Sequence, residues 1–267
     1  MSAASVTRGD GPIILGQPHG GTFVPSDIAA RLNSNGKILA DTDWHITDLY
    51  ADLVPDLTVV SATFHRYVID ANRDPTGDSL YPGQNTTGLC PLTDFDGAAI
   101  WKTGREPSAE DVAQRIATYH APYHAALSAE VARVKAKHGF AILYDCHSIR
   151  SRIPFLFDGT LPDLNIGTDN GKSCDVILAT AVQGVAESAG FSSVSNGGVR
   201  GGWTARHHGQ ALFCVHAVQL EIAQSAYLES ESPPWSFSSA KALSLQQVLA
   251  GILEALAARA KELPRHD

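Results

Sequence analysis

Two histidines and a glutamate lie in or just after short apolar segments, where buried strands would aim them at a common point. His19 follows the apolar residues 11–16, His147 follows residues 139–144, and Glu221 lies inside a third apolar segment. Two histidines and a carboxylate, with a fourth position open, form the usual ligand set of a catalytic zinc ion. A further glutamate can take a proton from water and pass it to a leaving amine. These residue types indicate metal-assisted hydrolysis.

Arginines stand close to these positions in the sequence, and a guanidinium group can hold a carboxylate through two parallel hydrogen bonds. For Arg73, an ion pair with Asp70 or Asp74 is the alternative interpretation. The chain has a formal net charge of −8, so an anionic ligand would need a local positive site. The candidates for substrate binding are Arg73, Arg150, Arg152, Arg200 and Arg206.

Several other polar residues allow both a structural and a functional interpretation. Asp41 and Asp43 precede a partial helical stripe and could cap a helix, or either could ligate a metal. Glu221 stands in a stretch that should be buried, so it must pair with an arginine or act as an acid or base near a metal. His120 and His124 lie in a helical stretch, where we expect partly buried helix residues.

The pattern of apolar residues predicts alternating strands and helices, which is typical of an α/β fold. Strands are expected at residues 11–16, 57–63, 65–70, 139–144, 153–157 and 213–222. Helices are expected at residues 25–32, 41–53, 108–138, 173–189 and 238–262. The helical region 108–138 opens with a capping box and is interrupted near Pro122. Loops are expected at residues 78–107, 162–171 and 194–208. No linker or internal repeat divides the chain.

The composition argues against several classes of protein. Of the 267 residues, 44% are hydrophobic and 18% are charged, as in ordinary globular proteins. No apolar run approaches the ~20 residues needed to span a bilayer, and the N-terminus lacks an apolar signal core, so we expect a cytoplasmic protein with no membrane partner. The negative charge argues against a nucleic-acid partner. The four cysteines form no CxxC pair, and the glycine-rich segment 196–202 lacks the Lys-Ser/Thr ending of a phosphate loop.

Six short motifs resemble the N-formylglutamate amidohydrolase (N-formylglutamate deformylase) family, and they occur in the order of that family. The resemblance covers about residues 11–260. It implies a hydrolase that converts N-formyl-L-glutamate, a small dicarboxylate, into formate and L-glutamate in histidine catabolism. The motifs are Pro18–Gly21, Asp41–Asp43, Asp70–Pro75, Asp145–Ser148, Asn165–Thr168 and Gln219–Ile222.

The family is itself distantly similar to zinc carboxypeptidases and aspartoacylases, and this implies a fold and a set of roles. The expected fold is one amidohydrolase domain over residues 1–267, with a mixed central sheet flanked by helices, as in zinc exopeptidases and related phosphorylase/hydrolase-like folds. His19 and His147 match the two histidine ligands of one divalent metal, expected to be Zn²⁺. Asn72 and Arg73 match the pair that holds a substrate carboxylate or polarises its carbonyl, and Glu221 matches the catalytic base.

One position departs from the peptidase pattern. A glutamate stands three residues after the first histidine in that pattern, whereas this chain has Thr22. The carboxylate ligand must therefore come from elsewhere, and we assign it to Asp43, with Asp41 as the second choice. Because the formyl group is small, we also expect a bulky wall over the metal, for which Trp203 and Trp101 are candidates.

Two alternatives stay open at this stage. One is a related zinc amidohydrolase that acts on another N-acyl amino acid or a peptide end. The other is a non-catalytic protein that binds an acidic amino acid through its arginines. A manganese formiminoglutamase is rejected, because His147 is not followed by the second spaced aspartate of its Asp-x-His-x-Asp clusters. The sequence leaves the oligomeric state and the identity of the metal open.

Overall fold

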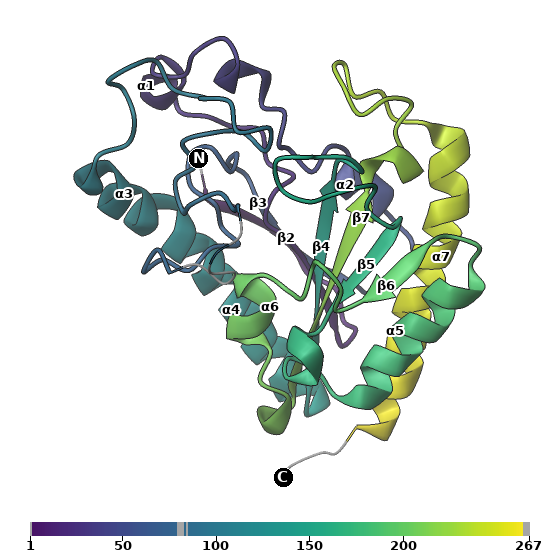
Figure 1. Cartoon of the computed structure of the whole chain (residues 1–267). Coiled ribbons are helices and arrows are strands. Elements are labelled where there is room, and N and C mark those ends of the chain that lie inside the picture. The colour runs from purple at the N-terminus through teal and green to yellow at the C-terminus, as the bar shows by residue number, and fades with distance from the viewer. Residues whose placement is uncertain (1, 79–82, 84, 264–267) are drawn as a thin grey trace.

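The computed structural model describes residues 2–78, 83 and 85–263. Its centre is a seven-stranded sheet in the order β1-β3-β2-β4-β7-β5-β6 (Figure 1). β1 runs antiparallel to β3 and β5 runs antiparallel to β7, whereas the other neighbouring pairs are parallel. The predicted mixed sheet is confirmed. The strands are β1 (Ala4–Thr7), β2 (Ile13–Gln17), β3 (Thr58–Ala62), β4 (Ala141–Ile149), β5 (Leu164–Gly167), β6 (Ser193–Ser195) and β7 (Val215–Ala223).

Helices cover both faces of this sheet. In Figure 1, α4 lies on one side of the sheet, whereas α5 and α7 lie together on the other. Strands buried on both faces need apolar residues at nearly every position, which is why the central strands are continuous apolar runs in the sequence. The helices are α1 (Ser26–Ala29), α2 (Ile46–Leu49), α3 (Ala109–Arg115), α4 (Ala121–His138), α5 (Val176–Ser188), α6 (Trp203–His208) and α7 (Ser239–Arg259).

The side chains of β4 point alternately to the face of the sheet covered by α4 and to the face covered by α5. Leu143 packs in the hydrophobic cluster that contains Leu127 of α4, whereas Tyr144 packs in the cluster that contains Leu178 of α5. Successive side chains of a strand point to opposite faces of the sheet. His147 is four residues beyond Leu143, so it points to the face covered by α4. Glu221 pairs with His147 in the register of β4 and β7 and shares that face.

The long helical region on the α4 side begins as predicted. The Ser108 side chain accepts from the backbone N–H of Asp111, and the Asp111 side chain accepts from the backbone N–H of Ser108, which forms a capping box. A π-helical segment, Ile116–His120, separates α3 from α4 just before Pro122. A proline lacks the N–H of a regular helix, so the expected interruption falls where the backbone geometry changes.

Two predicted strands are wrong. Residues 65–70 form a buried turn in which Val68 N–H donates to the carbonyl of His65 at 2.9 Å. Residues 153–157 also turn, because the N–H groups of both Leu156 and Phe157 donate to the carbonyl of Ile153. Both segments contain the apolar and aromatic residues that are typical of strands, but hydrogen bonds within each segment fold it into a turn.

Other element boundaries also differ from the predictions. The helix expected over 41–53 is limited to α2, because His45 has a left-handed φ of 57° that breaks any earlier turn. β4 continues through His147 to Ile149, so this histidine lies within the strand. β5 lies inside the predicted loop 162–171, and β6 and α6 overlap the predicted loop 194–208. β1 was not predicted. In the described part of the chain, we find no helix with the length and apolar character needed to span a membrane.

Candidate metal centre and pocket

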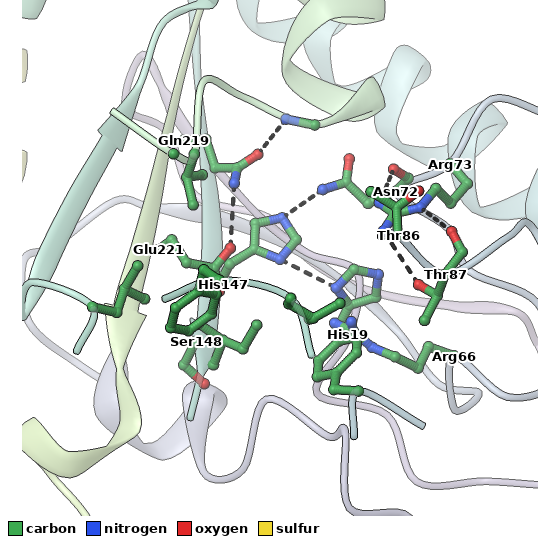
Figure 2. Close-up of a pocket in the computed structure, with 18 of the residues that line it drawn as sticks. His19, Arg66, Asn72, Arg73, Thr86, Thr87, His147, Ser148, Gln219 and Glu221 are labelled. Carbon is green, nitrogen blue, oxygen red and sulfur yellow. Dashed lines mark hydrogen bonds between the residues drawn. The ribbon is translucent and has the colours of Figure 1, made fainter. Parts of the chain in front are cut away.

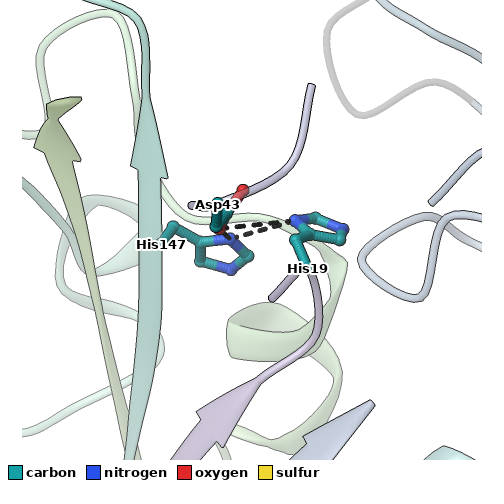
Figure 3. Close-up of side chains that lie close together, drawn as sticks. All are labelled: His19, Asp43 and His147. Carbon is teal, nitrogen blue, oxygen red and sulfur yellow. Dashed lines mark hydrogen bonds and ion pairs between the residues drawn. The ribbon is translucent and has the colours of Figure 1, made fainter. Parts of the chain in front are cut away.

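Three side chains from different segments converge at the carboxyl ends of β2 and β4 (Figure 3). β2 and β4 are parallel neighbours, so His19, two residues after β2, comes close to His147 near the end of β4. The segment before α2 brings Asp43 to the same point. All three are buried, with exposed fractions of 1–3%. This edge is where ligands bind in open α/β sheets.

The facing atoms of this group are those a metal would need. His19 Nδ1 lies 3.2 Å from His147 Nδ1, and Asp43 Oδ2 lies 3.3 Å from His147 Nδ1 and 3.9 Å from His19 Nδ1. Tetrahedral ligands about 2.1 Å from one zinc ion lie roughly 3.4 Å apart. Within residues 2–78, 83 and 85–263 these three side chains form the one group of this kind. Their donor types and spacing fit a divalent ion.

The outer edges of the two imidazoles face carboxylates. His19 Nε2 lies 2.7 Å from Asp70 Oδ1, and His147 Nε2 lies 3.1 Å from Asp145 Oδ2. The Asp145 contact is off the direction of a hydrogen bond, and His147 Nε2 also lies 3.1 Å from Asn72 Nδ2. Metal-binding histidines usually donate their second ring N–H to a carboxylate, which orients the ring. Asp70 and Asp145 are acceptors of this kind, whereas the amide nitrogen of Asn72 is itself a donor.

Asp43 is held on both of its oxygens. Arg66 donates to Oδ1 at 2.9 Å, and the backbone N–H of Ser148 donates to Oδ2 at 3.1 Å. Burial would raise the pKa of Asp43, but the guanidinium of Arg66 and the two neighbouring histidines outweigh it and lower that pKa. The carboxylate is therefore ionised, as a metal ligand must be.

The two histidines differ in their affinity for a proton. Burial, followed by the charge of Arg66, lowers the pKa of His19 to about 4, so this imidazole is neutral at pH 7. Burial acts in the same direction on His147, but the carboxylates of Asp145, Asp43 and Glu221 outweigh it and raise its pKa well above 6.5. A bound cation would compete with that proton, because only a neutral imidazole ligates a metal.

Glu221 faces the same pocket from β7. Its Oε2 accepts a hydrogen bond of 3.4 Å from Gln219 Nε2. Burial is the main cause that raises its pKa to about 7; the neighbouring His147 opposes this rise and Asp43 adds to it. A carboxyl group with this pKa can accept and release protons near neutral pH, which is what an acid–base catalyst requires.

A cavity of about 220 Å³ opens beside the three converging side chains (Figure 2). Among its described lining residues, Arg66 and Arg73 are the ones with a permanent positive charge. Much of the remaining wall is apolar: Phe95, Ile149, Leu156, Phe157, Leu161 and Val199. The bulky wall is therefore not the one we expected, because Trp101 and Trp203 do not line the cavity.

Asn72 and Arg73 both reach the cavity and are held by neighbouring groups. Arg73 donates from Nε to the carbonyl of Thr87 at 2.9 Å and from a terminal nitrogen to Thr87 Oγ1 at 3.2 Å. Asn72 Oδ1 accepts from the backbone N–H of Thr204 at 2.8 Å. Arg73 is thus fixed by Thr87, not by the predicted alternative of an ion pair with Asp70 or Asp74.

The other candidate arginines lie outside the cavity wall. Arg150 donates to Asp96 at 2.8 Å, and Arg206 donates to the carbonyl of Gly201 at 2.9 Å. Arg152 and Arg200 are exposed. The second choice for the carboxylate ligand, Asp41, does not join the metal group: its Oδ2 accepts from the hydroxyl of Tyr67 and the backbone N–H of Phe95.

Sequence reasoning missed Arg66 and the role of Asp70. Arg66 is only 6% exposed although it is always charged. Its position in the apolar stretch 65–70 was the same signal that drew attention to Glu221, namely a charge where burial is expected. Asp70 belongs to the Asp70–Pro75 motif, but nothing in its spacing shows that it faces His19.

This chain is similar to known proteins over most of its length. The family model described as N-formylglutamate amidohydrolase matches residues 11–228. The N-formylglutamate deformylase of Pseudomonas putida is 44% identical over 257 residues, which cover 95% of each chain. That of Pseudomonas aeruginosa is 42% identical over 261 residues, or 97% of each chain.

Solved structures share the fold. The crystal structure of N-formylglutamate amidohydrolase from Ralstonia eutropha JMP134 aligns with a TM-score of 0.77 at 24% identity and covers 96% of this chain and 97% of its own. The gene product Atu2144 from Agrobacterium tumefaciens aligns with a TM-score of 0.70 at 20% identity and covers 98% of this chain and 96% of its own.

Proposed function

The chain belongs to the N-formylglutamate amidohydrolase family, and from this membership we propose the following reaction and site. The enzyme hydrolyses the formamide bond of N-formyl-L-glutamate to give formate and L-glutamate. We assign the reaction to the cavity beside His19, Asp43 and His147. The single observation that supports this assignment most is the convergence of these three buried ligand atoms beside a glutamate whose pKa is about 7.

His19, Asp43 and His147 would hold one divalent ion, which we propose to be Zn²⁺. Such an ion supplies Lewis acidity toward the formyl oxygen and a water of lowered pKa. Asp70 fixes the ring of His19, and Arg66 with Ser148 N–H fixes the carboxylate of Asp43. These contacts preorganise the ligands, so little reorganisation is needed when substrate arrives.

Glu221 is the proposed general base. Its ionised carboxylate takes a proton from the attacking water, and the resulting carboxylic acid then protonates the nitrogen of glutamate as the C–N bond breaks. Its place in register with His147 puts it on the face of the sheet from which His147 projects. The raised pKa lets one group perform both transfers near neutral pH.

Arg73, with Asn72 beside it, is the proposed anchor for one substrate carboxylate. Fixed by Thr87, the guanidinium faces the cavity in a defined orientation. For the second carboxylate we retain the four other arginines as candidates. Arg150 and Arg200 are the stronger ones, because each directly follows a cavity residue, Ile149 and Val199.

The test is formate release from N-formyl-L-glutamate by the purified protein as isolated, after chelation, and after zinc or another divalent metal is restored. Loss with the chelator and recovery with metal would support substrate and site together. Activity that survives thorough metal removal would keep the substrate and overturn the metal centre. A folded protein that releases no formate with any metal would overturn the substrate, and other N-acyl amino acids would then be tested.

A further inference from the structure

A cluster of four histidines and a tryptophan joins α6 to the start of α4. Figure 1 shows the ribbons of these two helices near each other. His120 ends the π-helical segment, His124 lies in the first turn of α4, and His207 and His208 end α6. Trp203 packs among them, with ring centroids 4.5 Å from His124 and 4.1 Å from His207. None of the five is among the described residues that line the cavity, and the reaction proposed above does not use them.

Two of these histidines bind the backbone of the segment that carries Asn72 and Arg73. His120 Nε2 lies 2.9 Å from the carbonyl oxygen of Arg73, and His124 Nε2 lies 2.7 Å from the carbonyl oxygen of Ala71. A carbonyl only accepts, so both Nε2 atoms must carry a hydrogen. The two histidines therefore bind the backbone on both sides of Asn72.

His208 adds a further hydrogen bond behind His124. Its Nε2 lies 3.1 Å from Nδ1 of His124. Burial lowers the pKa of His124 to about 2 and that of His208 to about 4, so both rings are neutral at pH 7. Because neutral His124 carries its hydrogen on Nε2, its Nδ1 accepts and His208 Nε2 donates. The result is a series of hydrogen bonds that runs in one direction, from His208 through His124 to the carbonyl of Ala71, with the tautomers of both rings fixed.

The start of α6 binds the side chain of Asn72, which lies between the two carbonyls bound by the histidines. The backbone N–H of Thr204 donates to Asn72 Oδ1 at 2.8 Å. Gly202 lies so close that a Cβ added there would be 2.2 Å from Asn72 Nδ2. The same short helix therefore fixes the amide of Asn72 directly and, through His208 and His124, the backbone that precedes it.

We propose that His120 and His124, with His208 behind them, are positioning residues that hold the Ala71–Arg73 backbone so that Asn72 and Arg73 face the substrate. The inference rests on the proposed function, because it assigns substrate binding to those two side chains. A carbonyl that loses a buried donor is left unsatisfied, and the segment then shifts toward another partner. Small displacements of a substrate-positioning group are enough to weaken its action.

The first test replaces His124 by residues that remove or keep its donor. His124→Phe retains the bulk but loses both hydrogen bonds, and we expect it to raise KM for N-formyl-L-glutamate about tenfold while kcat changes less than about threefold. His124→Gln can place an amide N–H near the position of Nε2 and should recover most of that loss. The matched control is His138→Phe, since His138 ends the same helix and its Nε2 bonds the carbonyl of Asp10 at 2.9 Å.

A double-mutant cycle separates positioning from a merely structural role. If His124 acts through Arg73, then His124→Phe should change KM less than about twofold in an Arg73→Lys background, because the interaction it supports is already impaired. Equal changes of KM in both backgrounds would overturn the proposal. If His124→Phe does not fold, His120→Phe replaces it in the same double-mutant cycle, and its change of KM is judged by the same criterion.

A measurement on the unmodified protein is independent of activity. Two-bond ¹H–¹⁵N correlation spectra should show His124 and His208 as neutral Nε2–H tautomers at pH 7, whether or not metal is bound. An Nδ1–H tautomer or a charged ring at His124 would contradict the series of hydrogen bonds from His208 through His124 to Ala71. A wild-type protein inactive on N-formyl-L-glutamate would overturn the proposed function instead, whereas an active wild type with normal KM in His124→Phe would overturn this inference alone.

Discussion

Asp70 Oδ1 lies 2.7 Å from Nε2 of His19, on the edge of the imidazole opposite the Nδ1 atom that faces Asp43 and His147. Both side chains are buried, at 3% exposure for His19 and 0% for Asp70. The contact places the ring hydrogen of neutral His19 on Nε2 and leaves the lone pair of Nδ1 directed at the proposed metal. Asp70 Oδ1 also accepts from the backbone N–H of Asn72 at 2.8 Å, so one carboxylate links the proposed metal ligand His19 to the segment that carries Asn72 and Arg73.

We therefore expect Asp70→Asn to weaken metal binding about 10- to 100-fold, because a neutral amide orients and polarises the imidazole less well than a carboxylate. Competition with a chromophoric chelator would measure the change in Kd. Asp10→Asn is a suitable control, since Asp10 pairs with Lys137 on the surface. Unchanged metal affinity in Asp70→Asn would mean that this contact only supports the fold.

Metal binding should also stabilise the folded protein. A ligand that binds only the folded state at 100 times its Kd contributes about 2.7 kcal/mol. Added zinc should therefore raise the Tm of metal-free wild-type protein by several degrees and should barely change that of His147→Ala, which lacks one ligand. Differential scanning calorimetry measures both, and an equal rise in the variant would place the stabilising ion elsewhere.

Glu221→Gln should keep the metal and lower kcat by at least about 100-fold, because the amide cannot accept the proton of water. In the wild type, the pKa of Glu221 is raised to about 7, mainly by burial. The active form is the ionised one, so kcat/KM should rise with pH up to about 7 and level off above it. The rate profile and the metal content of both proteins check this, and near-normal kcat in metal-loaded Glu221→Gln would remove Glu221 as the base.

The arginines should differ in their effect on KM. Arg73→Lys replaces a fork of donors by a single ammonium and loses the bonds to Thr87, so we expect KM to rise about tenfold or more. Arg150→Ala tests the second anchor: KM should rise about tenfold if Arg150 binds the second carboxylate, and less than about threefold if Arg150 only pairs with Asp96 outside the cavity wall. Steady-state kinetics distinguish these cases. A large KM effect at Arg150 would assign it the second carboxylate.

The parts of the site that could be predicted from sequence lie on buried strands. β4 and β7 pair as central parallel strands, and their continuous apolar runs made the polar residues His147 and Glu221 conspicuous. Where two such strands lie parallel in one sheet, their carboxyl ends meet at the same edge. His19 was accessible to the same reasoning, because Pro18 and the following glycines end its strand with a turn.

The parts that could not be predicted depend on long-range packing in turns. Residues 65–70 have the composition of a strand, yet they form a buried turn that aims Arg66 at Asp43 and Asp70 at His19. Local propensity does not distinguish the two conformations when every side chain is buried by distant segments. Asp43 could be chosen only because the resemblance required a carboxylate, since its neighbours gave the pattern of a helix start.

Gly202→Ala is the sharpest steric test of the role of Asn72. Gly202 precedes the first residue of α6 with a φ of −80°, which alanine adopts without strain, so the backbone itself tolerates the change. The new Cβ, however, would lie 2.2 Å from Asn72 Nδ2 and must displace that amide from His147 and from Thr204 N–H. We expect kcat/KM to fall about 10- to 100-fold while the protein remains folded.

The matched control for this change is Gly184→Ala. Gly184 lies in α5, where an added Cβ meets nothing within 4 Å, and alanine favours the helix by up to about 1 kcal/mol. Gly184→Ala should therefore raise Tm slightly and leave kinetics unchanged. If Gly202→Ala retains wild-type kcat/KM, the amide of Asn72 can leave its observed position at no cost, and its proposed part in binding substrate would be withdrawn. If activity falls with Tm intact, the position of that one amide is required for the reaction.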